Sequence, residues 1–137
     1  MSRSLFVDSG AWIALTNPRD QHHLDADRLF RAAAESRLRL ITTNLVVAEV
    51  HRFLLHRSGL VIAARALDHI EAAENLSVEF ATPEHHRVAR EWLVRFADQP
   101  ITYTDAVSFA VMKARRCRAA LTFDRHFEIA GFERWRG

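Results

Sequence analysis

The chain has 137 residues, of which 49% are hydrophobic and 26% are charged. This composition is typical of a globular protein, and the length suits one core, so we expect residues 1–137 to form a single domain. The formal net charge of +2 permits an anionic partner without requiring one. The lone cysteine, Cys117, excludes an internal disulfide and fits a reducing cytoplasm. No segment approaches the roughly 20 apolar residues of a membrane span, so we expect no membrane contact.

In chain order, the hydrophobic pattern predicts strands that alternate with helices. Strands are expected over 4–7, 38–42, 75–80 and 119–123, with a weak edge strand over 132–136. Helices are expected around Trp12 and over 21–36, 45–58, 60–74, 83–98 and 105–116, with a short turn after Asp124. In the helix over 21–36 the expected buried face consists of Leu24, Leu29, Phe30, Ala33 and Ala34. This alternation favours an α/β domain with a parallel sheet covered on both faces.

Four acidic residues stand at notable places in this pattern. Asp8 ends the first apolar strand, and Asp124 directly follows the strand over 119–123. Asp105 lies in the first turn of a predicted helix, and Glu49 lies on another helix among apolar neighbours. Ligands of open α/β sheets bind outside the carboxyl ends of the strands, where distant parts of the chain converge.

Each acid also has a purely structural interpretation. Asp105 fits a capping arrangement with Thr102, and Asp124 or Asp8 fits a helix cap. Glu49 fits the solvated face of its helix, although a carboxylate among valines is costly to bury unless it is paired or bound to metal.

Taken together, the four acids favour a metal site. Carboxylates that share one pocket repel one another, and some protonate unless a cation neutralises them. No cluster of cysteine and histidine accompanies them in the sequence. Oxygen ligands suit hard ions such as Mg²⁺ or Mn²⁺, which activate water and orient an in-line attack on phosphate.

Four segments in order resemble the PIN domain family, specifically VapC-type toxins of bacterial type II toxin–antitoxin pairs. They are Phe6-Val7-Asp8-Ser9-Gly10-Ala11-Trp12, Thr42 to Glu49, Tyr103-Thr104-Asp105-Ala106 and Leu121 to Phe127. The resemblance implies a three-layer α/β/α domain with a central, mainly parallel sheet. It also implies an endoribonuclease that uses Mg²⁺ or Mn²⁺ to hydrolyse RNA phosphodiester bonds.

The family's acids fall on Asp8, Glu49, Asp105 and Asp124. On this basis Asp8, Asp105 and Asp124 are expected to bind the metal ion directly, while Glu49 holds the cluster together. The hydroxyls of Ser9 and Thr122 are expected to orient the carboxylates. Some relatives carry a further acid where this chain has His126. We interpret His126 as an exposed turn residue, with a phosphate contact as the alternative.

The resemblance further implies a cognate antitoxin protein as partner, a homodimer, and RNA as substrate. Candidate phosphate contacts are Arg52, Arg57 and the dense group over 113–118, although a solvated helix face explains each residue singly. His56 is interpreted in the same way. Two alternatives stay open: a free-standing PIN nuclease in RNA processing, and a catalytically inactive RNA-binding module. An aspartyl phosphotransferase has little support, because position 10 is Gly rather than a second Asp.

Overall fold

A computed structural model of the chain describes residues 3–137. Within these residues, five strands form one sheet in which all neighbouring strands are parallel. The strands are β1 (Ser4–Val7), β2 (Arg39–Thr43), β3 (Leu76–Glu79), β4 (Ala119–Leu121) and β5 (Glu133–Arg134). Their order across the sheet is β3-β2-β1-β4-β5, so the first strand of the chain is central. The expected parallel sheet is confirmed.

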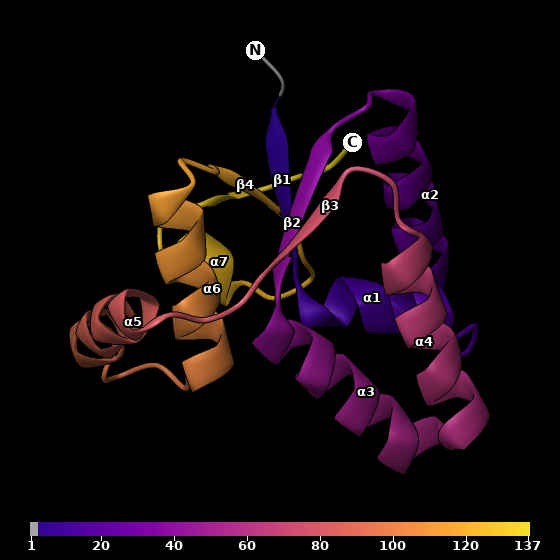
Figure 1. Cartoon of the computed structure of the whole chain (residues 1–137), viewed down its shortest axis with the longest axis horizontal. Coiled ribbons are helices and arrows are strands. Elements are labelled where there is room, and N and C mark those ends of the chain that lie inside the picture. Colours follow the sequence, from indigo (N-terminus) through magenta and orange to yellow (C-terminus); the bar gives the residue numbers. More distant parts are fainter. Residues whose placement is uncertain (1–2) are drawn as a thin grey trace.

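Helices cover both faces of this sheet, as Figure 1 shows: α1 to α4 lie on one side, and α5 to α7 on the other. In the described residues they are α1 (Ser9–Thr16), α2 (His23–Glu35), α3 (Asn44–Ser58), α4 (Leu60–Ala72), α5 (Pro83–Arg95), α6 (Tyr103–Ala114) and α7 (His126–Ile129). No helix among residues 3–137 combines the length and apolar character needed to cross a membrane. The three-layer α/β/α architecture is confirmed.

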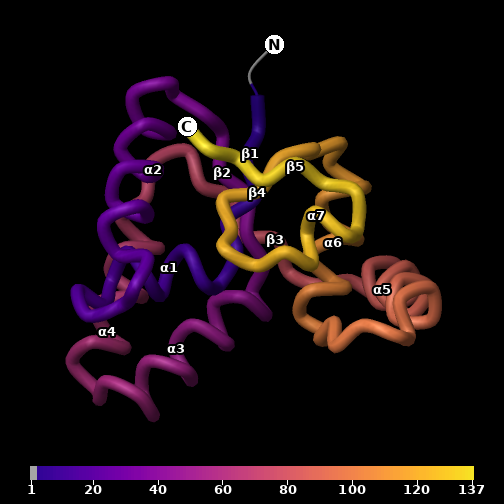
Figure 2. The backbone as a smooth tube through the Cα atoms, turned by 180° about the vertical axis from the view of Figure 1, so that it is seen from behind, coloured from indigo at the N-terminus to yellow at the C-terminus, as the bar shows by residue number. Residues whose placement is uncertain are grey.

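The strand order places a reversal between β1 and β4. From β1 the chain proceeds outward through β2 to β3, and the later strands β4 and β5 continue the sheet on the other side of β1. Figure 2 shows β4 and β5 beside β1 from behind. Phe6 is in register with Ile41 of β2 and with Ala120 of β4. In sheets of this type the ligand crevice lies outside the carboxyl ends of the strands at such a reversal.

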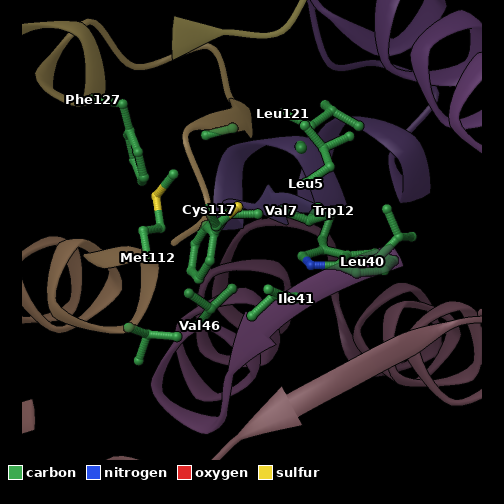
Figure 3. Packing of buried hydrophobic residues seen from close by; sticks show 14 of the residues in the cluster. Leu5, Val7, Trp12, Leu40, Ile41, Val46, Met112, Cys117, Leu121 and Phe127 are labelled. Carbon is green, nitrogen blue, oxygen red and sulfur yellow. The ribbon is translucent and has the colours of Figure 1, made fainter. Parts of the chain in front are cut away.

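The core explains why α6 holds its position so firmly. All residues from Asp105 to Met112 of this helix are buried, because the sheet lies on one side of α6 and α5 packs on another. Phe109 is central: its ring centroid lies 5.0 Å from that of Phe127 and 5.4 Å from that of Trp92. Figure 3 shows buried side chains of the strands together with Trp12, Val46 and Met112 from the surrounding helices. A helix buried all round places its first turn with little freedom.

The buried face of α2 differs from the prediction. Leu24 is 83% exposed and Ala34 is also exposed, whereas Ala26, Leu29 and Ala33 are buried. The three buried residues follow one narrow stripe along the helix. Leu24 precedes Ala26 by two positions, about 200° round a helix of 3.6 residues per turn, so it faces away from the core.

The end of β4 also differs from the prediction. The strand was expected to continue to residue 123, but it ends at Leu121. The hydroxyl of Thr122 takes up hydrogen bonds with acidic residues at this point. The backbone therefore leaves the sheet just where the chain begins to build its polar site.

Candidate metal centre

The predicted acids lie at the carboxyl edge of the sheet, around the reversal between β1 and β4. Asp8 follows β1, Asp124 lies shortly after β4, and Asp105 is in the first turn of α6. Glu49 lies in the second turn of α3, which directly follows β2. Charges on Asp105 and Asp124 both raise the pKa of Asp8, and charges on Asp124 and Glu49 raise that of Asp105. All four predicted acids therefore share one electrostatic environment.

Thr122 connects two of these acids directly. Its hydroxyl donates a hydrogen bond of 2.9 Å to Oδ2 of Asp8, and it accepts one of 3.0 Å from the backbone N–H of Asp124. Thr122 is buried, with 1% of its surface exposed. A single hydroxyl thus fixes the Asp8 carboxylate and the backbone that carries Asp124. Ser9, the other predicted hydroxyl, lies at the limit of hydrogen bonding, with its Oγ 3.5 Å from Oδ1 of Asp8.

Asp8 is buried in an environment that opposes its charge. It is 3% exposed, and burial followed by the nearby charge of Asp105 raises its pKa to about 7. Asp8 occupies the N-cap position of α1, but its side chain makes no capping hydrogen bond to this helix. Capping therefore does not explain the acidic side chain. An acid in this position is only partly charged at neutral pH, and a nearby cation would favour its charged form.

Asp105 combines a structural role with a place in the site. Its backbone N–H donates to the hydroxyl of Thr102, and its Oδ2 accepts from the Thr102 N–H at 3.4 Å, which completes a capping box. The residue is nevertheless 7% exposed, and burial together with the charge of Asp124 raises its pKa to about 6. The cap holds one carboxylate oxygen and so fixes the direction in which the group faces.

His126 corrects one sequence interpretation. Its side chain is only 14% exposed, so the exposed-turn interpretation is wrong. The first turn of α7 brings its Nδ1 to 3.0 Å from Oδ1 of Asp124, although this Nδ1 is buried and makes no hydrogen bond. The same Oδ1 accepts a hydrogen bond of 2.9 Å from the His126 backbone N–H. The sequence did not reveal the burial of His126, because this burial depends on how α7 folds back after Asp124.

The donor set fits a divalent cation. Among the described residues, one potential ligand atom each from Asp105, Asp124 and His126 lies within 4.8 Å of the others. Asp8 and Glu49 fall outside this compact group but add negative charge beside it. Clustered carboxylates with raised pKa values and an orphaned buried nitrogen are the features that a bound cation would satisfy. Direct binding by Asp8 stays a prediction.

A groove leads from this centre along α3. It has a volume of about 630 Å³ and is lined by Leu45, Ala48, Glu49, Arg52, Phe53, His56, Arg57 and Thr104. Thr104 immediately precedes Asp105, so the groove borders the acids. Four of the lining residues follow Glu49 at intervals of three, four, seven and eight, so these five residues share one face of the helix. That spacing was readable in the sequence, although the basic residues looked unremarkable one at a time.

The other group of basic residues lies away from the acids. Arg115, Arg116 and Arg118 come after the end of α6, whereas Asp105 is in its first turn. A helix of 12 residues is about 18 Å long, so the two groups are separated by nearly that distance. Arg115 also forms an ion pair with Glu79. The densest basic cluster in the sequence is therefore not part of the candidate site.

Comparison with known proteins places the chain in a family. The PIN domain model matches residues 5–133. Two curated proteins of Mycobacterium tuberculosis, from strains CDC 1551 / Oshkosh and ATCC 25618 / H37Rv, are each 36% identical over 130 residues, which cover 93% of this chain and 95% of theirs. Both are named 23S rRNA-specific endonuclease VapC20. The chain belongs to the PIN domain family.

A solved structure agrees with this assignment. The crystal structure of Mycobacterium tuberculosis VapC20, described as a sarcin-ricin loop cleaving toxin, is similar with a TM-score of 0.85 and 34% sequence identity. The alignment covers 97% of this chain and 99% of that one. The similarity thus extends over the sheet, both helical layers and the segments that carry the acids.

Proposed function

We propose that this chain is a divalent-metal-dependent endoribonuclease that acts as the toxin of a type II toxin–antitoxin pair. The observation that carries the proposal is the convergence of Asp8, Asp105, Asp124 and Glu49 at the carboxyl edge of a PIN domain sheet. Relatives named as ribosomal RNA endonucleases over nearly the whole chain support the same activity.

Mg²⁺ or Mn²⁺ is the proposed ion, because carboxylate oxygens are the ligands that these ions favour. When bound, such an ion supplies an acidified water and positive charge opposite the scissile phosphate. Asp105 and Asp124 would hold it, and Asp8 would contribute its charge or a direct contact. The two hydrogen bonds of the Thr122 hydroxyl hold the Asp8 carboxylate and the Asp124 backbone in a fixed relative position. Glu49, on the neighbouring helix, would position the attacking water. Hydrolysis would leave a 5′-phosphate and a 3′-hydroxyl.

The groove along α3 is the proposed path of the RNA strand. Arg52 and Arg57 line it beyond Glu49, and both can contact phosphates. Phe53 lines the same groove and is 43% exposed, with the Arg57 guanidinium 5.9 Å from its ring centroid. An aromatic ring flanked by arginines offers a stacking surface for an unpaired base. The groove therefore combines contacts for both parts of a single-stranded nucleotide.

Ribosomal RNA of the large subunit is the proposed substrate, since the matched relatives are named for 23S rRNA. Sequence-specific contacts to RNA are usually made to unpaired loops, which the open groove along α3 can accept.

A cognate antitoxin is the proposed partner, and we further propose a homodimer, a single domain over residues 1–137 and a cytoplasmic location.

Cleavage of RNA by the purified protein tests the central proposal. Ribosomes or 23S rRNA are incubated with protein and Mg²⁺ or Mn²⁺, and the product ends are mapped. The wild type is expected to cut at few positions and to lose activity with EDTA. Asp8→Asn is expected to be inactive, while the matched control Asp68→Asn, which changes an exposed acid on α4, retains activity. Equal cleavage by wild type and Asp8→Asn would refute the assignment.

The alternatives predict different results. A free-standing PIN nuclease in RNA processing would cut RNA, but its expression would not arrest growth and no neighbouring antitoxin would be required. An inactive RNA-binding module would bind RNA without any metal-dependent product. Retention of all four acids favours an enzyme, because a binding module gains nothing from a repulsive acidic pocket.

A further inference from the structure

The nitrogen Nδ1 of His126 has no hydrogen-bond partner, although it is buried at the centre of a polar site. An unsatisfied buried polar atom destabilises a protein, and few occur in native proteins. Oδ1 of Asp124 lies 3.0 Å from this nitrogen, but the two atoms form no hydrogen bond. The lone pair or proton on Nδ1 is therefore directed at something other than that oxygen.

We propose that His126 binds the divalent ion through its imidazole, beside Asp105 and Asp124, and that this nitrogen ligand makes the centre prefer Mn²⁺ to Mg²⁺. The inference rests on the proposed function, since it concerns the ion that serves the nuclease. It goes further by naming a ligand that is not an acid and by choosing between the two ions.

The spacing of the donor atoms supports shared ligation. Neighbouring ligands of an octahedral ion with bonds of about 2.1 Å are separated by about 3.0 Å. The distance between Nδ1 of His126 and Oδ1 of Asp124 is 3.0 Å. A ligand atom of Asp105 lies within 4.8 Å of both residues' ligand atoms. The imidazole therefore lies where an ion held by the two carboxylates would meet it.

The position of the ring argues against a direct role in holding RNA. A phosphate contact needs a donor that faces the solvent groove, but Nδ1 is enclosed and the side chain is 14% exposed. In addition, His126 does not line the groove along α3. The enclosed Nδ1 lies beside the Asp124 carboxylate, as a ligand of a shared ion would.

The choice of ion follows from the chemistry of the donor. Mg²⁺ strongly favours oxygen ligands and parts with its waters reluctantly. Imidazole nitrogen suits transition-metal ions, and Mn²⁺ also accepts carboxylate oxygen. A mixed set of two carboxylates and one imidazole therefore favours Mn²⁺ over Mg²⁺ when compared with an all-carboxylate set. His126→Asp should therefore shift the preference toward Mg²⁺.

Pulsed electron paramagnetic resonance with Mn²⁺ tests the ligand directly. The full-length wild type loaded with Mn²⁺ is expected to show modulation from a coordinated ¹⁴N nucleus. After ¹⁵N-histidine labelling, modulation from ¹⁵N should replace it. The signal should vanish in His126→Asn and His126→Asp but persist in the control His86→Asn, an exposed histidine on α5. Circular dichroism establishes that each variant is folded.

Competition between the two ions tests the selectivity. The ratio of the Mn²⁺ and Mg²⁺ dissociation constants, measured by Mn²⁺ titration with and without Mg²⁺, is expected to move at least about tenfold toward Mg²⁺ in His126→Asp. An unchanged ratio, or a wild type without nitrogen modulation, would overturn the inference. If RNA cleavage still depends on Asp8 in that case, the proposed function survives. If neither ion binds and no RNA is cut, both fail.

Discussion

Thr122 donates a 2.9 Å hydrogen bond to Asp8 from a position 114 residues further along the chain. The two residues follow the adjacent parallel strands β4 and β1, so the bond continues the contact between those strands beyond their ends. The same hydroxyl accepts the N–H of Asp124. One side chain therefore determines the relative placement of two acids that reach the site from opposite ends of the sequence.

Replacement of Thr122 by Val should impair activity more than stability. The substitution keeps the shape but removes both hydrogen bonds, each of which contributes about 0.5–1.5 kcal/mol. Asp8 then loses a donor that favours its charged form, so its pKa rises above about 7. We expect cleavage to fall at least about tenfold at pH 7 and to recover partly at pH 8.5, as measured by initial rates across pH.

Thr122→Ser is the matched control, because it retains the hydroxyl. Its pH profile should resemble that of the wild type. An unaltered pH profile in Thr122→Val would contradict the positioning role, even if the rate fell.

Metal binding should strengthen with pH across the range in which the acids lose protons. The pKa of Asp105 is raised to about 6 and that of Asp8 to about 7, both mainly by burial. Below this range protons compete with the ion for the carboxylates, and above it the carboxylates are already charged. Affinity should therefore rise from about pH 5 to about pH 8 and then level off. Calorimetry with Mn²⁺ in buffers of different ionisation enthalpy measures both the affinity and the protons released. A flat affinity across this range would show that these carboxylates do not exchange protons for the ion.

Asp8→Asn should stabilise the metal-free protein at alkaline pH. The folded-state pKa of Asp8, about 7, exceeds the ordinary value of 3.8 for an aspartate, so the folded state binds more protons than the unfolded state between these values. Stability consequently falls as pH rises from about 4 to about 7 and is then constant. At pH 8 the neutral amide should raise the free energy of unfolding by on the order of 2 to 4 kcal/mol, with little difference at pH 4.

Urea denaturation at both pH values, in EDTA, measures this effect. Asp68→Asn serves again as the exposed control. A less stable Asp8→Asn protein at pH 8 would mean that the carboxylate is a stabilising group, contrary to the burial described above.

Removal of the arginines in the α3 groove should weaken RNA binding in a salt-dependent manner. The logarithm of the affinity falls as the logarithm of the salt concentration rises. Arg52→Ala and Arg57→Ala are each expected to make this fall less steep by about 0.7, the value for one phosphate contact to a single strand. Arg116→Ala, an exposed arginine beyond the far end of α6, should leave the slope unchanged. Fluorescence anisotropy in an Asp8→Asn background gives the slopes without cleavage. Equal losses from all three variants would indicate nonspecific charge rather than a path along α3.

Local signals in the sequence were sufficient for most elements of the fold. β1 was predicted over 4–7 and occupies Ser4–Val7, because three apolar residues followed by an acid mark both its burial and its end. The hydroxyl of Thr43, the residue just before α3, caps the helix by accepting the Val46 N–H at 3.1 Å, as a threonine in that position commonly does. Such features depend only on neighbouring residues, so the sequence encodes them legibly.

Features that depend on tertiary contact were less accessible. His126 looked like a turn residue, and its burial becomes evident only when α7 folds against the acids. The face of α3 that carries Arg52 and His56 was visible as a helical spacing, but its proximity to Thr104 required the approach of α6. Periodicity reveals which residues share a face, whereas the partner of that face is decided by the sheet order.

The central position of β1 has a consequence for synthesis. The strand that precedes Asp8 is synthesised before its neighbour β4 and before Thr122 and Asp124, which all lie much later in the chain. A nascent chain that has not yet reached β4 has neither the hydroxyl that orients Asp8 nor the complete acidic cluster. We therefore expect the proposed cleavage site to be assembled only after the segment that follows β4 has been synthesised.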